Sequence, residues 1–328
     1  MKGNFRALAA VAAACLLGIA APCAQGETPA FPSKAVTLVV PYAPGGLPDT
    51  VARVVGQKLA EKWGHPVVVE NKPGGNGVVA AQYLMTKAPD GYTMLVTDGT
   101  MFAVNPFIYG SLPYDPHKDF TFISLTARAP LFLAVHPSLP ANNFPEFVAL
   151  VKANPGKYAY GSSGIGSIMH LATESLKAAL GLDLLHVPFK GTGQSIPAVV
   201  SNQVTAAFSA MPSLAGFVKD GKLKLIAVSY ATRSSLAPEI ATIAETSIPG
   251  FDFAPTIGFS GPAGMPAALA ARIGADVAEV LKDPALKERL YVLGIDPVGG
   301  GPAEYLAQVK DDTVRFEKAV KVAGARAE

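Results

Sequence analysis

The stretch from Val36 to Val51 limits what this chain can fold into, because it predicts a strand, a turn and the start of a helix in that order. Residues 36–40 form a short run of apolar and β-branched residues, typical of a strand buried on both faces of a parallel sheet. Three prolines and the Gly45-Gly46 pair exclude regular structure from Pro41 to Pro48. Apolar residues then recur at helical spacing. The sequence therefore predicts an α/β unit whose glycine-rich loop lies at the positive end of a helix, where an anion binds favourably.

The same order of elements recurs directly afterwards. A second strand is expected at Val67–Val69, a glycine-rich loop at Glu70–Gly77 and a helix at Val78–Lys87. A third strand at Thr93–Thr97 ends at Asp98-Gly99-Thr100. This β-α-β-α order predicts a parallel sheet with right-handed crossovers. Ligands of such sheets bind beyond the carboxyl ends of the strands, so the loops that follow these strands are the candidate site.

A composition shift near Thr126 introduces a second set of strands and helices. Tyr158–Tyr160 is expected to form a strand and Ile168–Leu180 a helix, and the loop Gly161–Ser167 between them is rich in glycine and serine. Its hydroxyl groups add to the backbone donors, so it suits an anion better than the first loop does. The remaining expected strands are Phe120–Leu125, Leu131–Val135, Leu184–Val187, Val204–Phe208, Leu223–Ser229, Thr256–Ser260 and an edge strand at Leu290–Val292; the remaining helices are Phe144–Ala153, Ser195–Val200, Ala267–Lys282 and Pro302–Val322.

The N-terminus has the features of a secretory signal peptide. Basic residues precede an apolar run from Ala7 to Ala21, and Ala24-Gln25-Gly26 offers a small-x-small cleavage site. The run is too short to span a membrane, and no later segment supplies about 20 uninterrupted apolar residues. We therefore expect an exported, periplasmic chain that is cleaved near Gly26. A lipid anchor at Cys23 is the alternative, although Pro22 stands where such signals favour a small Gly or Ala.

The composition excludes several classes of function. Loss of Lys2 and Arg6 with the signal peptide balances the charges, because the whole chain has 27 basic and 25 acidic residues. A neutral chain offers no electrostatic surface for nucleic acid. Cys15 and Cys23 would leave as well, so the exported chain could form neither a disulfide nor a cysteine nucleophile. The remaining length of roughly 300 residues favours two domains.

No catalytic or metal-binding set stands out. The five histidines have no H-x-x-x-H spacing, so neither a metal nor another cofactor is expected. Ser163 or Ser167 with His170 could form an activated serine, which would make the chain a periplasmic hydrolase. The G-x-S-x-G elbow of such enzymes is absent. We expect His170 to tie down the start of its helix and Asp49 to cap the first helix, so no enzyme is predicted.

Short motifs that follow one another along the chain resemble one family. They are Pro41–Asp49, Glu70–Gly77, Pro89–Thr93, Asn105-Pro106, Gly161–Leu171, Val187–Gly191 and Gly261–Pro266. Together they resemble the tripartite tricarboxylate transporter substrate-binding proteins, also called the Bug family. Each motif is short, but the set covers nearly the whole exported chain.

The resemblance implies an α/β periplasmic-binding-protein fold of two domains, each a mostly parallel sheet flanked by helices, with the ligand cleft between them. We expect residues 27–125 and 232–328 to form domain I and residues 126–231 to form domain II. The chain would cross between them near Leu125-Thr126 and Tyr230-Ala231. Closure of the two domains over a ligand is the known response of this architecture.

The resemblance also implies a receptor that holds a small organic carboxylate, largely through backbone groups and ordered water, and delivers it to membrane transporter subunits. By position, the expected ligand-binding residues are Tyr42, Pro44, Gly45, Gly46, Asp49 and Thr100 in the first domain and Ser162, Ser163, Gly164, Ser167, His170, Lys190 and Gly191 in the second. The chain is expected to work as a monomer. Signalling to a membrane sensor is an alternative output that the sequence leaves open.

Two positions depart from the family pattern. Leu47 stands where a small polar residue is usual, so one hydroxyl contact is missing. The segment Ser201–Ala210 replaces the usual Gly-Gly-x-Val-Asp and Phe-Asp signatures, which removes an acid that could face an amino group. The expected ligand is therefore a mono- or dicarboxylate, including aromatic ones, in preference to an amino acid.

Overall fold

The computed structural model describes residues 31–327, in which the residues from Lys34 onward form one compact unit. The predicted signal peptide and its cleavage site near Gly26 lie outside the described residues. The strands are β1 (Val36–Val40), β2 (Val67–Asn71), β3 (Thr93–Asp98), β4 (Phe120–Arg128), β5 (Phe132–Val135), β6 (Tyr158–Ser162), β7 (Leu184–Pro188), β8 (Ala206–Ser209), β9 (Lys224–Val228), β10 (Thr256–Pro262) and β11 (Asp296–Gly300).

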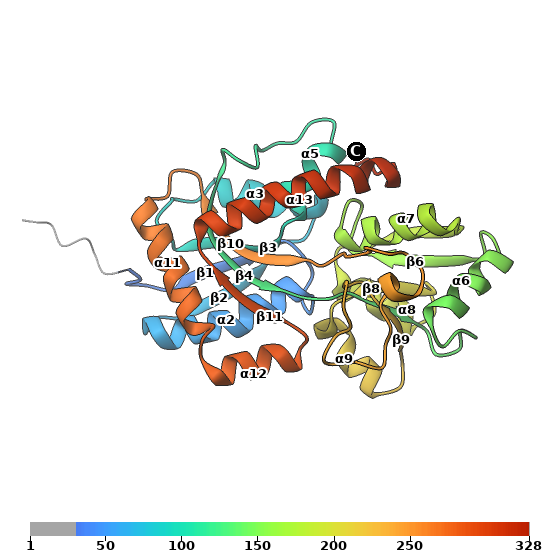
Figure 1. Cartoon of the computed structure of the whole chain (residues 1–328). Helices are drawn as coiled ribbons and strands as arrows, with labels where there is room; N and C mark the ends of the chain where they lie inside the picture. The colour runs from blue at the N-terminus through green and yellow to red at the C-terminus, as the bar shows by residue number, and fades with distance from the viewer. Residues whose placement is uncertain (1–30, 328) are drawn as a thin grey trace, which may run out of the picture. The chain divides into compact units, whose positions relative to one another are not determined.

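The helices alternate with these strands along most of the chain, as Figure 1 shows. They are α2 (Leu47–Trp63), the 3-10 turn η1 (Gly75–Gly77), α3 (Val78–Met85), α4 (Thr100–Ala103), α5 (Asn105–Ile108), α6 (Phe144–Ala153), α7 (Ile168–Leu180), α8 (Thr192–Val200), α9 (Met211–Lys219), α10 (Ile243–Thr246), α11 (Ala267–Val280), α12 (Pro284–Val292) and α13 (Pro302–Ala323).

The strands form two sheets. The first has six strands in the order β11-β4-β10-β3-β1-β2, and the second has five in the order β7-β6-β8-β5-β9. Strand β1 runs parallel to β2 and β3, and β6 runs parallel to β7 and β8, as the β-α-β order predicts. Loops at the carboxyl ends of these parallel strands supply the candidate site.

Most strands of each sheet run in one direction, as predicted, but each sheet also contains antiparallel pairs. Strand β10 is antiparallel to both β3 and β4, and β5 is antiparallel to both β8 and β9. Strand β4 carries the chain out to the five-stranded sheet and β10 carries it back. Neighbouring strands that leave and re-enter a sheet at the same edge must run in opposite directions.

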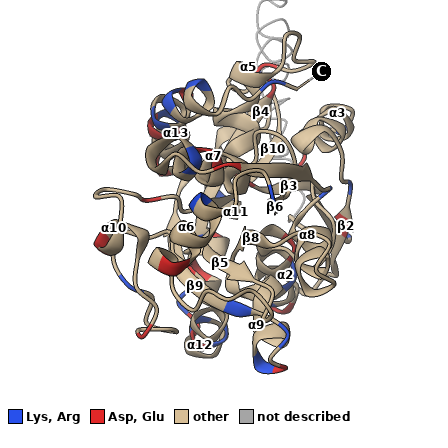
Figure 2. Ribbon diagram, turned by 90° about the vertical axis from the view of Figure 1, so that its right-hand side faces the viewer, with Lys and Arg blue, Asp and Glu red and all other residues tan. Residues whose placement is uncertain are grey.

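Helices cover both faces of the six-stranded sheet. Helix α2 packs on β1, β2 and β3 and also contacts α11. Helix α13 packs on β4 and contacts α4. The core under α13 is aromatic: Phe102 makes edge-to-face contacts with Phe120 and Phe122, whose ring centroids lie 5.2 and 5.1 Å away. Figure 2 shows many of the charged residues on helices such as α9 and α13.

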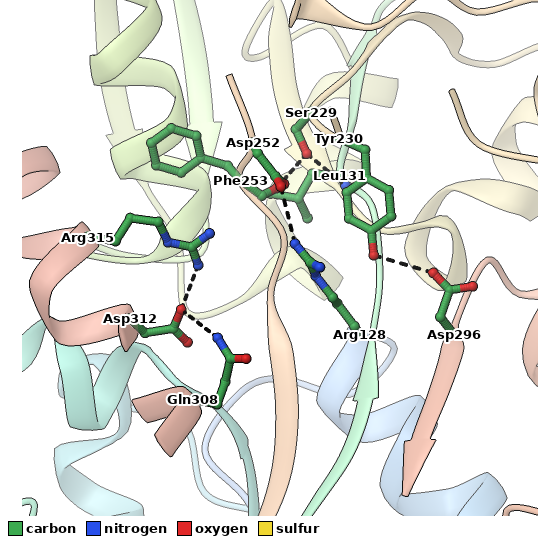
Figure 3. A network of polar contacts seen from close by, with 10 residues as sticks. All are labelled: Arg128, Leu131, Ser229, Tyr230, Asp252, Phe253, Asp296, Gln308, Asp312 and Arg315. Atoms are coloured by element: carbon green, nitrogen blue, oxygen red, sulfur yellow. Dashed lines mark hydrogen bonds and ion pairs between the residues drawn. The ribbon is translucent and has the colours of Figure 1, made fainter. Parts of the chain in front are cut away.

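Two segments connect the sheets, residues 129–131 after β4 and residues 229–255 after β9. Ser229 is hydrogen-bonded to Leu131 of the first segment and to Phe253 near the end of its own segment (Figure 3). Its N–H donates to Leu131 O at 2.8 Å, and its carbonyl accepts from Phe253 N–H at 3.0 Å. Its hydroxyl donates to Phe253 O at 2.5 Å and accepts from Leu131 N–H at 3.1 Å. The two crossings therefore form one hydrogen-bonded unit.

Charged side chains flank these crossings. Arg128 forms an ion pair with Asp252 at 3.3 Å and lies over the ring of Tyr230, whose hydroxyl donates to Asp296 at 3.4 Å (Figure 3). The ion pair is partly exposed, with 41% and 32% of the two side chains accessible, so water screens it and it contributes at most about 1 kcal/mol. The hydrogen bonds between Ser229 and Leu131 therefore connect the two crossings more firmly than this ion pair does.

The predicted edge strand at Leu290–Val292 is wrong, because these residues end helix α12. Asp283 caps this helix by accepting from Leu286 N–H at 2.8 Å, and Pro284 occupies its first position. The edge of the sheet is instead β11, which pairs with β4. No helix among residues 31–327 is both long enough and apolar enough to cross a membrane.

Candidate functional site

A cavity of about 270 Å³ lies between loops of the two sheets. The loops that follow β1, β2 and α5 approach it from the six-stranded sheet, and those that follow β6 and β7 approach it from the five-stranded sheet. Its lining residues are Pro41, Tyr42, Gly74, Gly75, Asn76, Tyr109, Ser163, Gly164, Ile165, Pro188, Phe189, Lys190 and Ala327. Lys190 is the charged side chain among these lining residues, and none of them carries a carboxylate.

The structure brings some of the predicted ligand-binding residues to this cavity and places the others beside or behind it. Tyr42, Ser163, Gly164 and Lys190 line it. Those that do not line it are Pro44, Gly45, Gly46, Asp49, Thr100, Ser162, Ser167, His170 and Gly191. The contacts of each group indicate what the site can do.

Tyr42 lies at the carboxyl end of β1, and its hydroxyl is held below the cavity. The hydroxyl donates to Asp98 at 3.1 Å and contacts the Thr100 hydroxyl at 3.2 Å. Thr100 also donates to Asp98 from both its N–H and its side chain. Burial and the charge of Asp98 raise the pKa of Tyr42 well above its usual value. Burial also raises the pKa of Asp98, against the hydrogen bonds from Thr100. Thr100 therefore supports Tyr42 from behind and does not line the cavity.

Asp49 braces the first glycine-rich loop from inside. Its carboxylate accepts Gly45 N–H at 3.0 Å, two hydrogen bonds from Arg53 at 3.0 and 2.9 Å, and Asn71 Nδ2 at 2.9 Å. Burial acts to raise the pKa of Asp49, but the hydrogen bonds from Arg53, Gly45 and Asn71 outweigh it and leave the pKa below its usual value. Asn71 also donates to Tyr42 O at 3.1 Å. This network fixes the path of the loop.

Pro44, Gly45 and Gly46 lie beside the cavity, next to the first turns of α8 and α9. Ala43 N–H donates to Lys190 O at 3.2 Å. A Cβ atom on Gly46 would lie 3.0 Å from the Thr192 hydroxyl. The first loop therefore contacts the other sheet directly, beside the cavity.

The second glycine-rich loop is held by two histidines that stack face to face at 4.1 Å. The Ser162 hydroxyl contacts His186 Nε2 at 2.7 Å and accepts Gly164 N–H at 3.1 Å. His170 Nδ1 accepts Gly166 N–H at 3.1 Å. Burial lowers the pKa of His170, and burial together with the neighbouring His170 lowers the pKa of His186 to about 3. Both rings are therefore neutral at pH 7.

The backbone donors of the two loops are only partly free. Gly45 and Gly166 donate their N–H groups to side chains of the helices that follow, and Gly164 donates to the Ser162 hydroxyl, as described above. Within the described part of the chain, Ser163 N–H and Ile165 N–H take part in no hydrogen bond. Both residues line the cavity. The donors that can meet a ligand include these two amides and the Lys190 ammonium group.

The serine hydrolase alternative lacks its geometry. The Ser163 hydroxyl donates to Met169 Sδ at 3.2 Å, and the Ser167 hydroxyl caps α7 by accepting His170 N–H at 3.3 Å. Across residues 31–327, neither hydroxyl is hydrogen-bonded to the His170 ring, so no base activates either serine. Within the same residues, no group of three or more His, Cys, Asp or Glu side chains could hold a metal ion.

Several lining residues were not predicted from the sequence. Gly74, Gly75 and Asn76 belong to a glycine-rich loop that was recognised at the end of a strand, but none of its residues was among the predicted ligand-binding residues. Asn76 adopts a left-handed φ of 47° and donates to Asn105 Oδ1 at 2.8 Å. Tyr109 and Ala327 had no sequence signal, because Ala327 reaches the site only by pairing with Tyr109, more than 200 positions earlier in the chain.

Comparison with known proteins supports a family assignment. A family model described as the tripartite tricarboxylate transporter family receptor matches residues 51–324. A UPF0065 protein of Bordetella pertussis (strain Tohama I) is 34% identical over 313 residues, which are 95% of this chain and 95% of that protein. The similarity therefore extends over both proteins nearly from end to end.

Two solved structures share the fold. A protein of R. palustris solved with adipate matches with a TM-score of 0.88 at 31% identity, over 90% of this chain and 99% of that one. MatC of Rhodopseudomonas palustris with bound malate matches with a TM-score of 0.83 at 30% identity, over 88% of this chain and 100% of that one. The predicted α/β fold class is confirmed.

Proposed function

Because the chain belongs to the tripartite tricarboxylate transporter receptor family, we propose that it is a periplasmic receptor that binds a small organic carboxylate between its two sheets. Membership of a receptor family agrees with the prediction that the chain is not an enzyme. We further propose that it delivers the bound carboxylate to membrane transporter subunits, and that its signal peptide is removed near Gly26.

The observation that carries the proposal is the uneven polarity of the cavity. Lys190, Ser163 N–H and Ile165 N–H offer positive charge and free donors, and no acidic side chain lines the space. The N-terminus of α7 follows the same loop, and the helix dipole places partial positive charge there. Such a set favours a carboxylate, because charge-assisted hydrogen bonds to an anion are stronger than neutral ones.

The rest of the lining limits the ligand further. Tyr109, Ile165 and Phe189 offer apolar and aromatic surface, and the volume of about 270 Å³ suits a small molecule. Outside this lining, Ser209 stands where the family pattern has an acid, and its buried hydroxyl has no partner among the described residues. No carboxylate is therefore available there for an amino group. We propose a mono- or dicarboxylate, aromatic acids included, bound by a monomer.

We also propose that the two sheets belong to two domains that close over the ligand. The division near residues 125 and 231 expected from the sequence lies close to the hydrogen-bonded segments 129–131 and 229–255. Paired crossings of this kind let two domains rotate about a narrow connection.

The first test is a thermal-shift screen with the purified, ligand-free chain. The panel contains adipate, malate, succinate and benzoate, with adipamide as the uncharged control for adipate. A carboxylate present at 100 times its Kd should stabilise the fold by about 2.7 kcal/mol. Adipamide should have no effect, because it carries no charge for Lys190 to attract.

The matched variants are Lys190→Gln in the cavity and Lys152→Gln on the exposed surface of α6. Lys190→Gln should weaken binding of the stabilising acid about ten-fold, which corresponds to the loss of one charged hydrogen bond. Lys152→Gln should bind as the parent does. A folded, ligand-free sample that no acid stabilises would contradict the proposed function.

A further inference from the structure

The loop Ala43–Gly46 packs directly against two segments of the five-stranded sheet, Lys190–Gly193 and the start of α9 at Ser213. We call these three segments the closing contact. Ala43 N–H donates to Lys190 O at 3.2 Å, and the Ser213 hydroxyl donates to Gly45 O at 2.9 Å. Lys190 follows β7, and Ser213 lies in the first turn of α9, which follows β8, so both bonds reach segments beyond the ends of strands.

Glycines allow the two backbones to approach this closely. A Cβ atom on Gly193 would overlap Pro44 O, and one on Gly191 would lie 3.1 Å from Ala43 N. Gly193 lies within α8 and has no left-handed φ. A side chain at this position would therefore be excluded by Pro44 and not by its own backbone.

A relay of two hydroxyl groups completes the closing contact. The Thr192 and Ser213 hydroxyls lie 3.0 Å apart. The carbonyl of Gly45 can only accept, so the single Ser213 hydroxyl proton points to Gly45 O. Thr192 must then donate to Ser213. The relay therefore runs from Thr192 through Ser213 to the first loop, and loss of either hydroxyl breaks it.

The closing contact borders the cavity on one side. Tyr42 and Lys190 line the cavity, and they lie next to or within the segments that touch. On another side the two sheets touch at Gly166, where a Cβ atom would overlap Ile108 Cδ1. The cavity is thus bordered by two places where the loops of the two sheets meet. Of these, the closing contact is the one built from hydrogen bonds.

We propose that Ser213 and Thr192 are positioning residues that hold the closing contact together, and that this contact must open before a ligand can enter or leave the cavity. The inference rests on the proposed function of the cavity. Its test needs no knowledge of the ligand, so the two can fail separately.

A single cysteine in the cavity can report how often the closing contact opens. Cys15 and Cys23 are the only native cysteines, so both are replaced by serine and Ser163→Cys is added to the full chain. Ser163 lines the cavity and is 8% exposed. The probe is 2-sulfonatoethyl methanethiosulfonate, an organic anion whose reaction with the thiol is followed by mass spectrometry.

In this background, Ser213→Ala should raise the labelling rate about five-fold. Loss of one neutral hydrogen bond shifts the equilibrium between the closed and open arrangements by about that factor. Ser213→Thr keeps the hydroxyl and should restore the parental rate. Gly193→Ala should raise the rate about ten-fold or more, because its Cβ atom cannot coexist with Pro44 O in the closed arrangement.

Two controls separate opening from general loosening. Gly216→Ala lies in α9, where a Cβ atom meets nothing within 4 Å, and should leave the labelling rate unchanged. A reporter cysteine at exposed Ser201 should react equally fast in every variant. The proposal is overturned if the cysteine of Ser163→Cys is labelled at the parental rate in both the Ser213→Ala and the Gly193→Ala backgrounds. It is also overturned if these two substitutions raise the labelling rate of the Ser201→Cys reporter by the same factor as that of Ser163→Cys.

Discussion

At the scale of single residues, Asp49 illustrates a polar side chain that organises a loop from within. Each of its carboxylate oxygens already accepts two hydrogen bonds from Gly45, Arg53 and Asn71. The sequence correctly suggested a residue of the first helical turn, and its place among the ligand-binding residues stays a prediction. The observed bonds favour a role in holding Gly45 and Tyr42 in position.

Asp49→Asn tests that role. The amide would turn one acceptor into a donor and leave Gly45 N–H or Asn71 without its partner. We expect a loss of about 1–3 kcal/mol of unfolding free energy, measured by urea denaturation. Glu61→Gln, at an exposed position on the same helix, should change stability by less than about 0.5 kcal/mol. Equal stability of parent and Asp49→Asn would show that the network contributes little.

At the scale of elements, the packing of α13 on β10 depends on one glycine. A Cβ atom on Gly258 would overlap the ring of Tyr305, which is fully buried. Tyr305 also packs edge-on against Phe122 at 5.1 Å. The absence of a side chain in the middle of β10 therefore makes room for the aromatic core beneath α13.

Gly258→Ala should destabilise the protein by about 3 kcal/mol, because the ring of Tyr305 has no free space into which it can move. Gly110→Ala is the control, since a Cβ atom there meets nothing within 4 Å. In a thermal denaturation series, the double variant Gly258→Ala/Tyr305→Ala should lose less than the sum of the two single losses. Strict additivity would mean that the two residues do not compete for space.

Helices with strong local signals were predicted accurately. The expected bounds of Phe144–Ala153 and Ile168–Leu180 are those of α6 and α7, because Asn143 and Ser167 cap their first turns. The strand expected at Leu290–Val292 failed for the opposite reason. Three apolar or aromatic residues fit either a strand or the end of a helix, and the capping residues Asp283 and Pro284 lie outside that short window.

At the scale of the whole molecule, stability should depend on pH through the stacked histidines. His186 has a folded pKa of about 3, below its value of 6.5 in the unfolded chain, so the unfolded chain takes up the proton first as the pH falls. The stabilising contribution of neutral His186 is therefore fully present above about pH 6.5 and is lost progressively as the pH falls toward 3. At pH 5 we expect a loss of about 2 kcal/mol from His186.

The check is the unfolding free energy of parent and His186→Gln between pH 5 and pH 8. Replacement by a neutral amide should flatten the decline below pH 6.5. His117→Gln, at an exposed position, should keep the parental slope. A parental slope in His186→Gln as well would assign the pH dependence to other groups.

The sequence by itself determined most of the strands and longer helices, the family, and two of the loops that border the cavity. Those features follow from local patterns: apolar periodicity, capping residues and the glycines of short turns. Only the tertiary structure decided that β10 would separate β3 from β4 and that Gly45 and Gly46 would face the other sheet. It also decided that Tyr109 and Ala327 would line the cavity. The physical reason is that these features depend on contacts between segments far apart in the chain. The role of a glycine or alanine there is set by the residue that packs against it, and the local sequence does not specify that residue.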